Sequence, residues 1–201
     1  MEKYKTTLKS TSFLHIELKK AAKLYLQGME VPEIKKKAED ENIFMLKTEN
    51  RINEVASALS KRLNALDEEL INKMANDTLE TSKQIALYSI MKTDRLFFEF
   101  MQEVYKEKCL IQDYTITDKD FNIFFQNKAE QDSKVASWKD YTYYKLSQVY
   151  KRILIDAGLA KKDKKTLEIT RPLVNKDLKE YLKNNGGKIY LEAMLGEKIN
   201  E

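Results

Sequence analysis

The sequence predicts an all-α fold, a helical bundle in which the only expected strands form one small β-hairpin. Of the 201 residues, 42% are hydrophobic and 34% are charged, and there are only two prolines and five glycines. This composition is typical of an ordered, mainly helical protein. Apolar residues also recur at spacings of three and four over long stretches, which indicates amphipathic helices. We expect three regions, 1–70, 71–132 and 133–201, either as separate domains or packed as one.

The N-terminal region is predicted to be helix-turn-helix-like. A first helix is expected from Ser12 to Gln27, and Gly28 is a suitable residue to end it. A second helix is expected from Pro32 to about Asp40, because proline is tolerated in a first turn. Thr48 can cap a third helix with an apolar face through Leu59. The predicted order is helix, short turn, helix, loop, helix. This order is compatible with a helix-turn-helix unit.

The outward faces of these helices carry candidate DNA-binding side chains. The third helix presents Asn50, Asn53, Ser57 and Lys61, and the first presents Lys20 and Lys23. Asn can pair with adenine, and Lys with guanine or phosphate, so such faces suit a major groove. The alternative is that these polar residues only solvate an exposed helix.

The middle of the chain is predicted to form the core. Two helical stretches between Thr78 and Leu110 are dense in Leu, Ile, Phe, Met and Tyr. Next, Thr117 to Asp120 resembles a capping box that opens a helix through Phe121 and Phe124. We expect this helix to pack against the same core.

The C-terminal region opens with a two-sided helix that we expect to start at Ser137, with Asp140 three residues later. One side is apolar and carries Leu146, Tyr150 and Ile153. The other side carries a mixture of tyrosines and cations: Tyr141, Tyr144, Lys145, Gln148, Lys151 and Arg152. Phosphate contacts come from such side chains, so this face favours nucleic-acid binding.

A basic hairpin is expected directly after this helix. Gly158 can take the left-handed conformation that ends a helix, and Leu159 to Pro172 alternates as a short hairpin would. Four lysines occupy its tip, and an arginine lies near its end. The further DNA-binding candidates are therefore Lys161, Lys162, Lys164, Lys165 and Arg171. The order of helix, Gly-Leu and basic hairpin is winged-helix-like. The alternative is an ordinary surface turn.

Charge is distributed unevenly along the chain, although the net charge is only +4. Lys and Arg outnumber Asp and Glu by nine to four in residues 1–37 and by ten to four in residues 133–172. In residues 38–132 the acids outnumber the cations by nineteen to twelve. Clustered positive charge attracts polyanions, but it could instead face the acidic middle of the chain.

The residues that most catalytic and cofactor sites need are scarce. One histidine and one cysteine, His15 and Cys109, permit no histidine pair, no disulfide and no thiolate cluster, and both suit packing positions. We expect no catalytic residues, no metal, no cofactor and no small-molecule substrate. Charged residues interrupt every apolar run, so we also expect no membrane partner and a cytoplasmic protein.

Five segments in series resemble the BrxA family of bacteriophage exclusion (BREX) defence systems. They are YKTTLKSTSFLHIELKKAAKLYLQG, NIFMLKTENRINEVASALSKRL, LYSIMKTDRLFFEFMQEVYKEK, ITDKDFNIFF and SWKDYTYYKLSQVYKRILIDAGL, which together cover about Tyr4 to Leu159. The resemblance implies a non-enzymatic accessory factor with a helical fold similar to the RNA-binding protein NusB, helix-turn-helix character and double-stranded DNA binding. It provides no catalytic residues and no contact motif to transfer, so the site residues above come from the sequence pattern.

Three functional hypotheses follow. The first is a sequence-tolerant module for double-stranded DNA, which predicts salt-sensitive affinity. The second is an RNA-binding factor of the NusB type. The third is an adaptor whose basic faces contact other BREX proteins.

Overall fold

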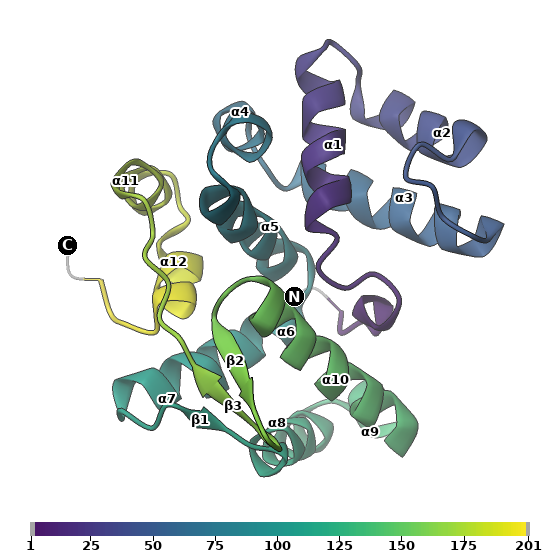
Figure 1. Ribbon diagram of the computed structural model, residues 1–201. Coiled ribbons are helices and arrows are strands. Elements are labelled where there is room, and N and C mark those ends of the chain that lie inside the picture. The colour runs from purple at the N-terminus through teal and green to yellow at the C-terminus, as the bar shows by residue number, and fades with distance from the viewer. Residues whose placement is uncertain (1–2, 200–201) are drawn as a thin grey trace. The chain divides into compact units, whose positions relative to one another are not determined.

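The computed structural model of the protein describes residues 3–199 and confirms a mainly helical fold with one small sheet (Figure 1). The chain forms two compact units. One unit is Ser10–Thr93, and the other consists of the described residues up to Lys9 together with those from Asp94 onward. The division into three regions stays a prediction.

The unit Ser10–Thr93 is built entirely from helices. They are α1 (His15–Leu26), α2 (Val31–Glu41), α3 (Glu49–Asn64), α4 (Glu68–Asn76) and α5 (Leu79–Thr93). Helix α1 begins three residues later than expected, because Leu14 has a left-handed backbone with φ 48°. Gly28 has φ 92° and ends this segment as predicted. The predicted Thr48 cap is confirmed, since its hydroxyl accepts a hydrogen bond from the Arg51 amide at 3.3 Å.

A buried arginine organises the segment that precedes α1. Arg62 of α3 is only 3% exposed. Its guanidinium donates to the carbonyl oxygens of Phe13 at 2.8 Å and Ser12 at 2.7 Å. Because guanidinium is a fork of several donors, one side chain can satisfy several carbonyls that have no helical partner. The entry of the chain into α1 is thereby fixed against α3.

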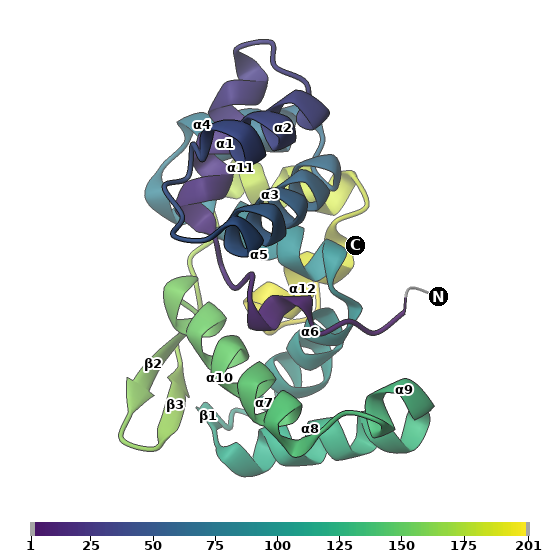
Figure 2. The ribbon, with the colours of Figure 1, turned by 90° about the vertical axis from the view of Figure 1, so that its right-hand side faces the viewer.

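The second unit contains the sheet and the remaining helices. Its elements are η1 (Thr7–Lys9), α6 (Arg95–Phe100), the π-helical η2 (Met101–Lys106), α7 (Glu107–Leu110), β1 (Thr115–Ile116), α8 (Asp118–Gln131), α9 (Ser133–Ala136), α10 (Asp140–Asp156), β2 (Ala160–Asp163), β3 (Thr166–Ile169), α11 (Lys176–Asn184) and α12 (Lys188–Leu195). In Figure 2, α10 lies beside both α8 and the hairpin of β2 and β3.

Two predicted helix starts in this unit have different outcomes. The capping box at Thr117 is confirmed, with the Asp120 carboxylate accepting from the Thr117 amide at 2.7 Å. The start at Ser137 is wrong. A separate turn, α9, ends at Ala136, and Ser137 is its C-cap residue, whose hydroxyl donates to the Lys134 carbonyl. Helix α10 begins only at Asp140, after Lys139.

The sheet has one strand more than the sequence predicted. The hairpin of β2 and β3 is confirmed, with Ala160 opposite Ile169 and Asp163 opposite Thr166. Strand β1 pairs with β3 on the other side, so the order is β1-β3-β2 and all pairs are antiparallel. The hairpin is therefore anchored to the chain that leads into α8.

An aromatic core fixes α10 against α6 and α8. Tyr150 of α10 is fully buried, with its ring centroid 4.9 Å from Phe97 and 5.2 Å from Phe100. Phe100 in turn stacks on Phe121 of α8 at 4.9 Å. Close-packed aromatic rings resist displacement, so the outward faces of α8 and α10 are held in a defined relation.

A buried ion-pair network ties α8 to α6 and to the start of the chain. Lys128 of α8 is 3% exposed and its ammonium lies 2.7 Å from the Glu99 carboxylate. Tyr4 and Arg95 donate to the same carboxylate. Burial raises the pKa of Glu99, but these three hydrogen bonds together lower it below its ordinary value. The ionised carboxylate therefore holds three segments together.

Candidate nucleic-acid interface

Helix α10 presents the two faces that its periodicity predicts. Leu146, Tyr150 and Ile153 are buried. Tyr141, Tyr144, Lys145, Gln148 and Arg152 are exposed, and Lys151 is half-buried. Because the apolar stripe is packed in the core, the polar face points outward.

A tight turn returns the chain from α10 to the hairpin. Gly158 has φ 78°, a conformation that costs glycine little. The Leu159 amide donates to the Leu154 carbonyl at 2.8 Å, and the Gly158 amide donates to Ile155 at 3.0 Å. This pattern is a helix-ending Schellman motif. Leu159 is buried, so the hairpin leaves the helix in a fixed direction and packs beside it.

A hollow of about 550 Å³, here called the basic groove, lies between α10 and the hairpin. Its lining joins candidates from both elements. They are Gln148, Lys151, Arg152 and Ile155 of α10, Lys162 of β2, Lys164 and Lys165 of the turn, Thr166 and Leu167 of β3, and Asp118 of α8. Six of the predicted DNA-binding residues therefore meet in one concave site.

The cations of the basic groove differ in how strongly they are already neutralised. Lys151 is paired with Asp118 and also lies over the Phe121 ring at 5.2 Å. The Arg152 guanidinium lies 3.4 Å from Asp156. Lys162, Lys164 and Lys165 are exposed and have no ion-pair partner within residues 3–199. The hairpin lysines therefore supply most of the uncompensated positive charge.

The other predicted candidates of this unit lie outside the basic groove. The Lys145 ammonium lies 5.3 Å from the centre of the Tyr141 ring, which is a cation–π contact on the exposed face of α10. Lys161 is exposed on β2. Arg171 is held away from the groove, because its guanidinium pairs with Glu197 at 2.8 Å and with the Leu195 carbonyl at 3.3 Å.

The N-terminal candidates belong to the other compact unit. Lys23, Asn50, Asn53 and Lys61 are exposed, and Ser57 is half-buried. Lys20 donates to the Ile43 carbonyl at 2.6 Å, which ties α1 to the loop before α3. None of these residues lines the basic groove.

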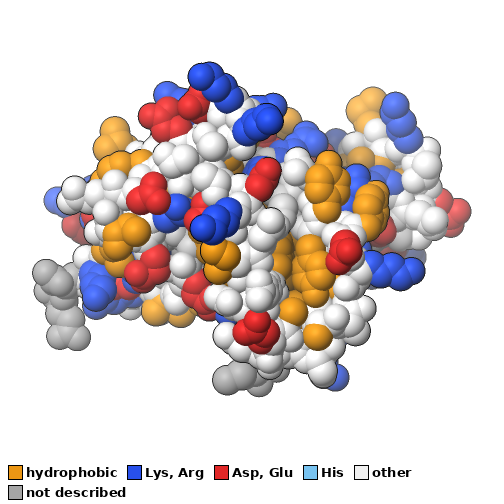
Figure 3. Space-filling view, turned by 90° about the horizontal axis from the view of Figure 1, so that it is seen from below, with side chains coloured by type: hydrophobic (Ala, Val, Ile, Leu, Met, Phe, Trp, Pro, Cys, Tyr) orange, Lys and Arg blue, Asp and Glu red, His pale blue; other side chains and the backbone are white. Residues whose placement is uncertain are grey.

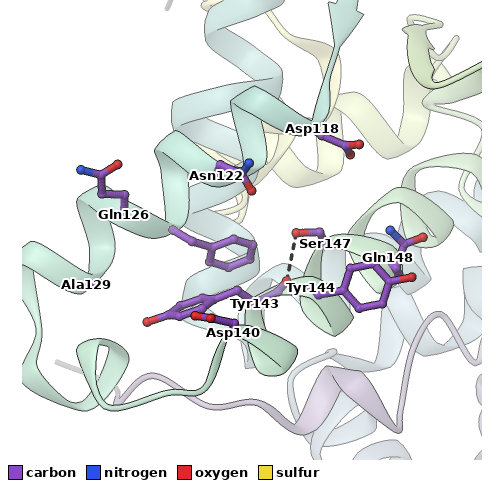
Figure 4. A pocket seen from close by; sticks show the side chains of 10 residues that line it. Asp118, Asn122, Gln126, Ala129, Asp140, Tyr143, Tyr144, Ser147 and Gln148 are labelled. Carbon is purple, nitrogen blue, oxygen red and sulfur yellow. Dashed lines mark hydrogen bonds between the residues drawn. The ribbon is translucent and has the colours of Figure 1, made fainter.

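A second hollow, of about 510 Å³, lies between α8 and α10 and is here called the amide groove (Figure 4). It is lined by Asp118, Asn122, Phe125, Gln126 and Ala129 of α8 and by Asp140, Tyr143, Tyr144, Ser147 and Gln148 of α10. Asp118 and Gln148 line both grooves, so the two hollows adjoin. The α8 side of this site was not predicted from the sequence, although Asn122 and Gln126 have the i, i+4 spacing of one helix face.

Within residues 3–199, neither the histidine His15 nor the cysteine Cys109 lines either groove. No group of three or more His, Cys, Asp or Glu side chains is arranged to hold a metal ion in this range. His15 is buried and lies 2.8 Å from the Ser82 hydroxyl, and Cys109 is buried. Within the same range, no helix has the length and apolar character needed to cross a membrane.

The fold and the two grooves define a mainly helical protein with a lysine-lined cleft suited to a polyanion. The family follows from comparison of the sequence with known proteins. The family model described as BrxA matches residues 2–186. The chain is also 52% identical over 194 residues to "BREX protein BrxA" from Bacillus cereus (strain H3081.97), covering 96% of this chain and 97% of that protein. The protein therefore belongs to the BrxA family, and the resemblance inferred from the five segments is confirmed.

A solved structure shares the fold. The crystal structure of an uncharacterized protein from Magnetospirillum magneticum aligns with a TM-score of 0.83 over 98% of this chain and 100% of that one. The sequence identity is only 20%. This likeness supports the arrangement of helices and carries no information about function.

Proposed function

We propose that this protein is a non-enzymatic, double-stranded-DNA-binding accessory protein of a BREX anti-phage defence system, acting in the cytoplasm. The observation that carries the proposal is the basic groove. Around one hollow it brings five cations: Lys151, Arg152, Lys162, Lys164 and Lys165. Among the described residues, Asp118 is the one acid in its lining. Phosphate contacts dominate the affinity of proteins for DNA, and they come from Lys, Arg, Tyr and amide groups such as these.

The backbone at the hairpin tip supports a functional use of its lysines. Lys164 has a left-handed backbone with φ 46°. Glycine or asparagine suits such a position, because a Cβ atom there crowds the neighbouring carbonyl. A lysine at this point of the turn is therefore kept at a cost in stability. Strained positions of this kind are often found at binding sites.

The mode of binding follows from how the basic groove is built. Its charged walls are a rigid helix and a hairpin anchored by β1, so they can follow one phosphate backbone without reading the bases. We therefore expect sequence-tolerant binding that weakens with salt. The exposed Tyr141 of α10 extends this surface with an additional phosphate donor.

The test is a fluorescence anisotropy titration of a labelled, blunt, random-sequence DNA duplex at low and at physiological salt. Wild type is compared with Lys162→Glu/Lys164→Glu/Lys165→Glu and with the control Lys3→Glu/Lys9→Glu/Lys47→Glu. The control reverses the same charge at exposed lysines outside the groove. We expect the hairpin variant to lose roughly tenfold or more in affinity and the control about twofold. Circular dichroism melting checks that both remain folded.

Equal losses in the two variants, or no binding by wild type at low salt, would reject the groove as a duplex site. A matched RNA duplex and a single strand are titrated alongside. A preference for RNA would favour the RNA-binding alternative. An association with other BREX proteins that survives nuclease treatment, without DNA binding, would favour the adaptor.

A further inference from the structure

The amide groove differs in charge from the basic groove that it adjoins. Among residues 3–199, no Lys or Arg lines it, and it carries the carboxylates of Asp118 and Asp140. Phosphate is therefore disfavoured inside it. A neutral group that donates hydrogen bonds would be favoured, because carboxylates are acceptors. Figure 3, seen from below the view of Figure 1, shows a hollowed strip of hydrophobic side chains on this side of the molecule and Lys and Arg side chains along the upper edge.

The floor of the amide groove is aromatic and rigid. The rings of Phe125 and Tyr143 lie 5.6 Å apart. The Tyr143 hydroxyl donates to the Val135 carbonyl, which fixes the ring in place. Burial, and next the charge of Asp140, raise the pKa of Tyr143, so its phenol stays neutral. Such a floor can support a flat ring without adding charge.

The rim of the amide groove offers hydrogen-bonding groups that have no partner within residues 3–199. The amides of Asn122 and Gln148 and the hydroxyl of Tyr144 are exposed and form no hydrogen bond with another residue in this range. The Tyr144 ring is 57% exposed and makes no ring–ring contact in the described part of the chain. Figure 4 shows Asn122 and Tyr144 on opposite sides of the hollow. Amides that both donate and accept match the edges of nucleobases.

We propose that the amide groove binds an unpaired nucleobase of a DNA strand whose phosphates lie in the basic groove. This inference rests on the proposed function, because it uses the same cations to hold the backbone. A positive groove flanked by aromatic and amide groups is the arrangement that unpaired strands require, since bases stack on rings while phosphates follow the charge. The preferred ligand is then a duplex with a short single-stranded end or gap rather than a continuous duplex.

The experiment compares three labelled DNA probes by anisotropy. One is a blunt duplex, one carries a short single-stranded overhang, and one carries the same overhang with abasic sites. The last two have equal phosphate charge and differ only in their bases. Wild type should bind the base-containing overhang about fivefold or more tightly than the abasic one, which is the effect of one stacked base.

Two variants locate the effect. Asn122→Ala/Tyr144→Ala removes groups from both sides of the amide groove and should reduce the fivefold difference to less than about twofold. Because the two overhang probes have equal phosphate charge, any loss of a backbone contact weakens both equally and does not change this difference. Asn127→Ala, an exposed amide of α8 outside the groove, should leave the difference intact. A 2-aminopurine in the overhang should be quenched by wild type and less by the groove variant.

The outcomes separate the two proposals. If the blunt duplex binds but the base-containing and abasic overhangs bind equally, this inference is wrong and the proposed function stands. If the groove variant keeps the difference, the base lies elsewhere and the inference is likewise wrong. If no probe binds, the proposed function itself fails.

Discussion

At the scale of a single residue, Asp118 marks the boundary between the basic groove and the amide groove. Its carboxylate lies at their junction, where it pairs with Lys151 and reduces the positive charge available to a phosphate. The side chain is 71% exposed, so the pair is screened by water and is weak. Binding of DNA would break this pair or share Lys151 between two acceptors.

Removing this charge should strengthen DNA binding. Asp118→Asn keeps the shape of the side chain and releases Lys151, so we expect affinity for a blunt duplex at low salt to rise by about twofold to fivefold, the scale of one exposed charge pair. The control is Asp177→Asn, which removes an acid from the start of α11, away from both grooves. Anisotropy titrations of both variants test this expectation. Weaker binding by Asp118→Asn would show that the carboxylate has a positive role, such as holding Lys151 in position.

Individual exposed residues could be predicted where helical periodicity is strong. The face of α10 with Tyr144 and Gln148 was found in this way, because Leu146, Tyr150 and Ile153 mark the opposite side. The α8 side was missed because three phenylalanines made the helix look like core alone. Asn122 and Gln126 become informative only when α10 is placed beside them. Arg171 was counted as a candidate, yet its pairing with Glu197 depends on the return of the C-terminal segment.

At the scale of an element, the turn of the hairpin carries two positively charged residues, and the backbone of one of them is strained. Lys164 holds the left-handed position of the turn, whereas Lys165 has an ordinary negative φ. The two residues carry the same charge and both line the basic groove. Substituting each of them by the same residue therefore separates the effect of backbone strain on stability from the effect of charge on binding.

Glycine at position 164 should improve stability and impair binding. We expect Lys164→Gly to raise the free energy of unfolding by roughly 0.5–1 kcal/mol, because the Cβ crowding is removed. Duplex affinity should fall, because one phosphate contact is lost. Lys165→Gly should also weaken binding, but it should not stabilise the protein, since its φ needs no glycine. Urea unfolding and anisotropy together check the prediction. A stability loss in Lys164→Gly would contradict the strain argument.

Helices and strands could be predicted where residues close together in the sequence determine them. They were missed where they depend on pairing with a distant segment. Thr48, Thr117 and Gly158 identified helix ends correctly because capping is local chemistry. Strand β1 has two residues, too few to alternate, and exists only through its pairing with β3. The Ser137 start failed because α9 interrupts the segment, and Asp132 caps that turn from further upstream.

At the scale of the whole molecule, the candidate DNA-binding residues fall into two sets. The C-terminal cations converge because Gly158 folds the hairpin back beside α10. The N-terminal set lies on helices of the other compact unit. Membership of the BrxA family agrees with the order of helices from which the resemblance was inferred. We therefore propose that the basic groove has the dominant role in DNA binding.

The most direct test is the dependence of duplex affinity on salt. The logarithm of the dissociation constant of a blunt duplex is measured against the logarithm of salt concentration for wild type and for Lys162→Ala/Lys164→Ala/Lys165→Ala. Each phosphate contact contributes about 0.9 to the slope, so the variant should have a slope shallower by roughly two to three. A wild-type slope near zero, or equal slopes for the two proteins, would contradict the claim that the basic groove holds the phosphate backbone.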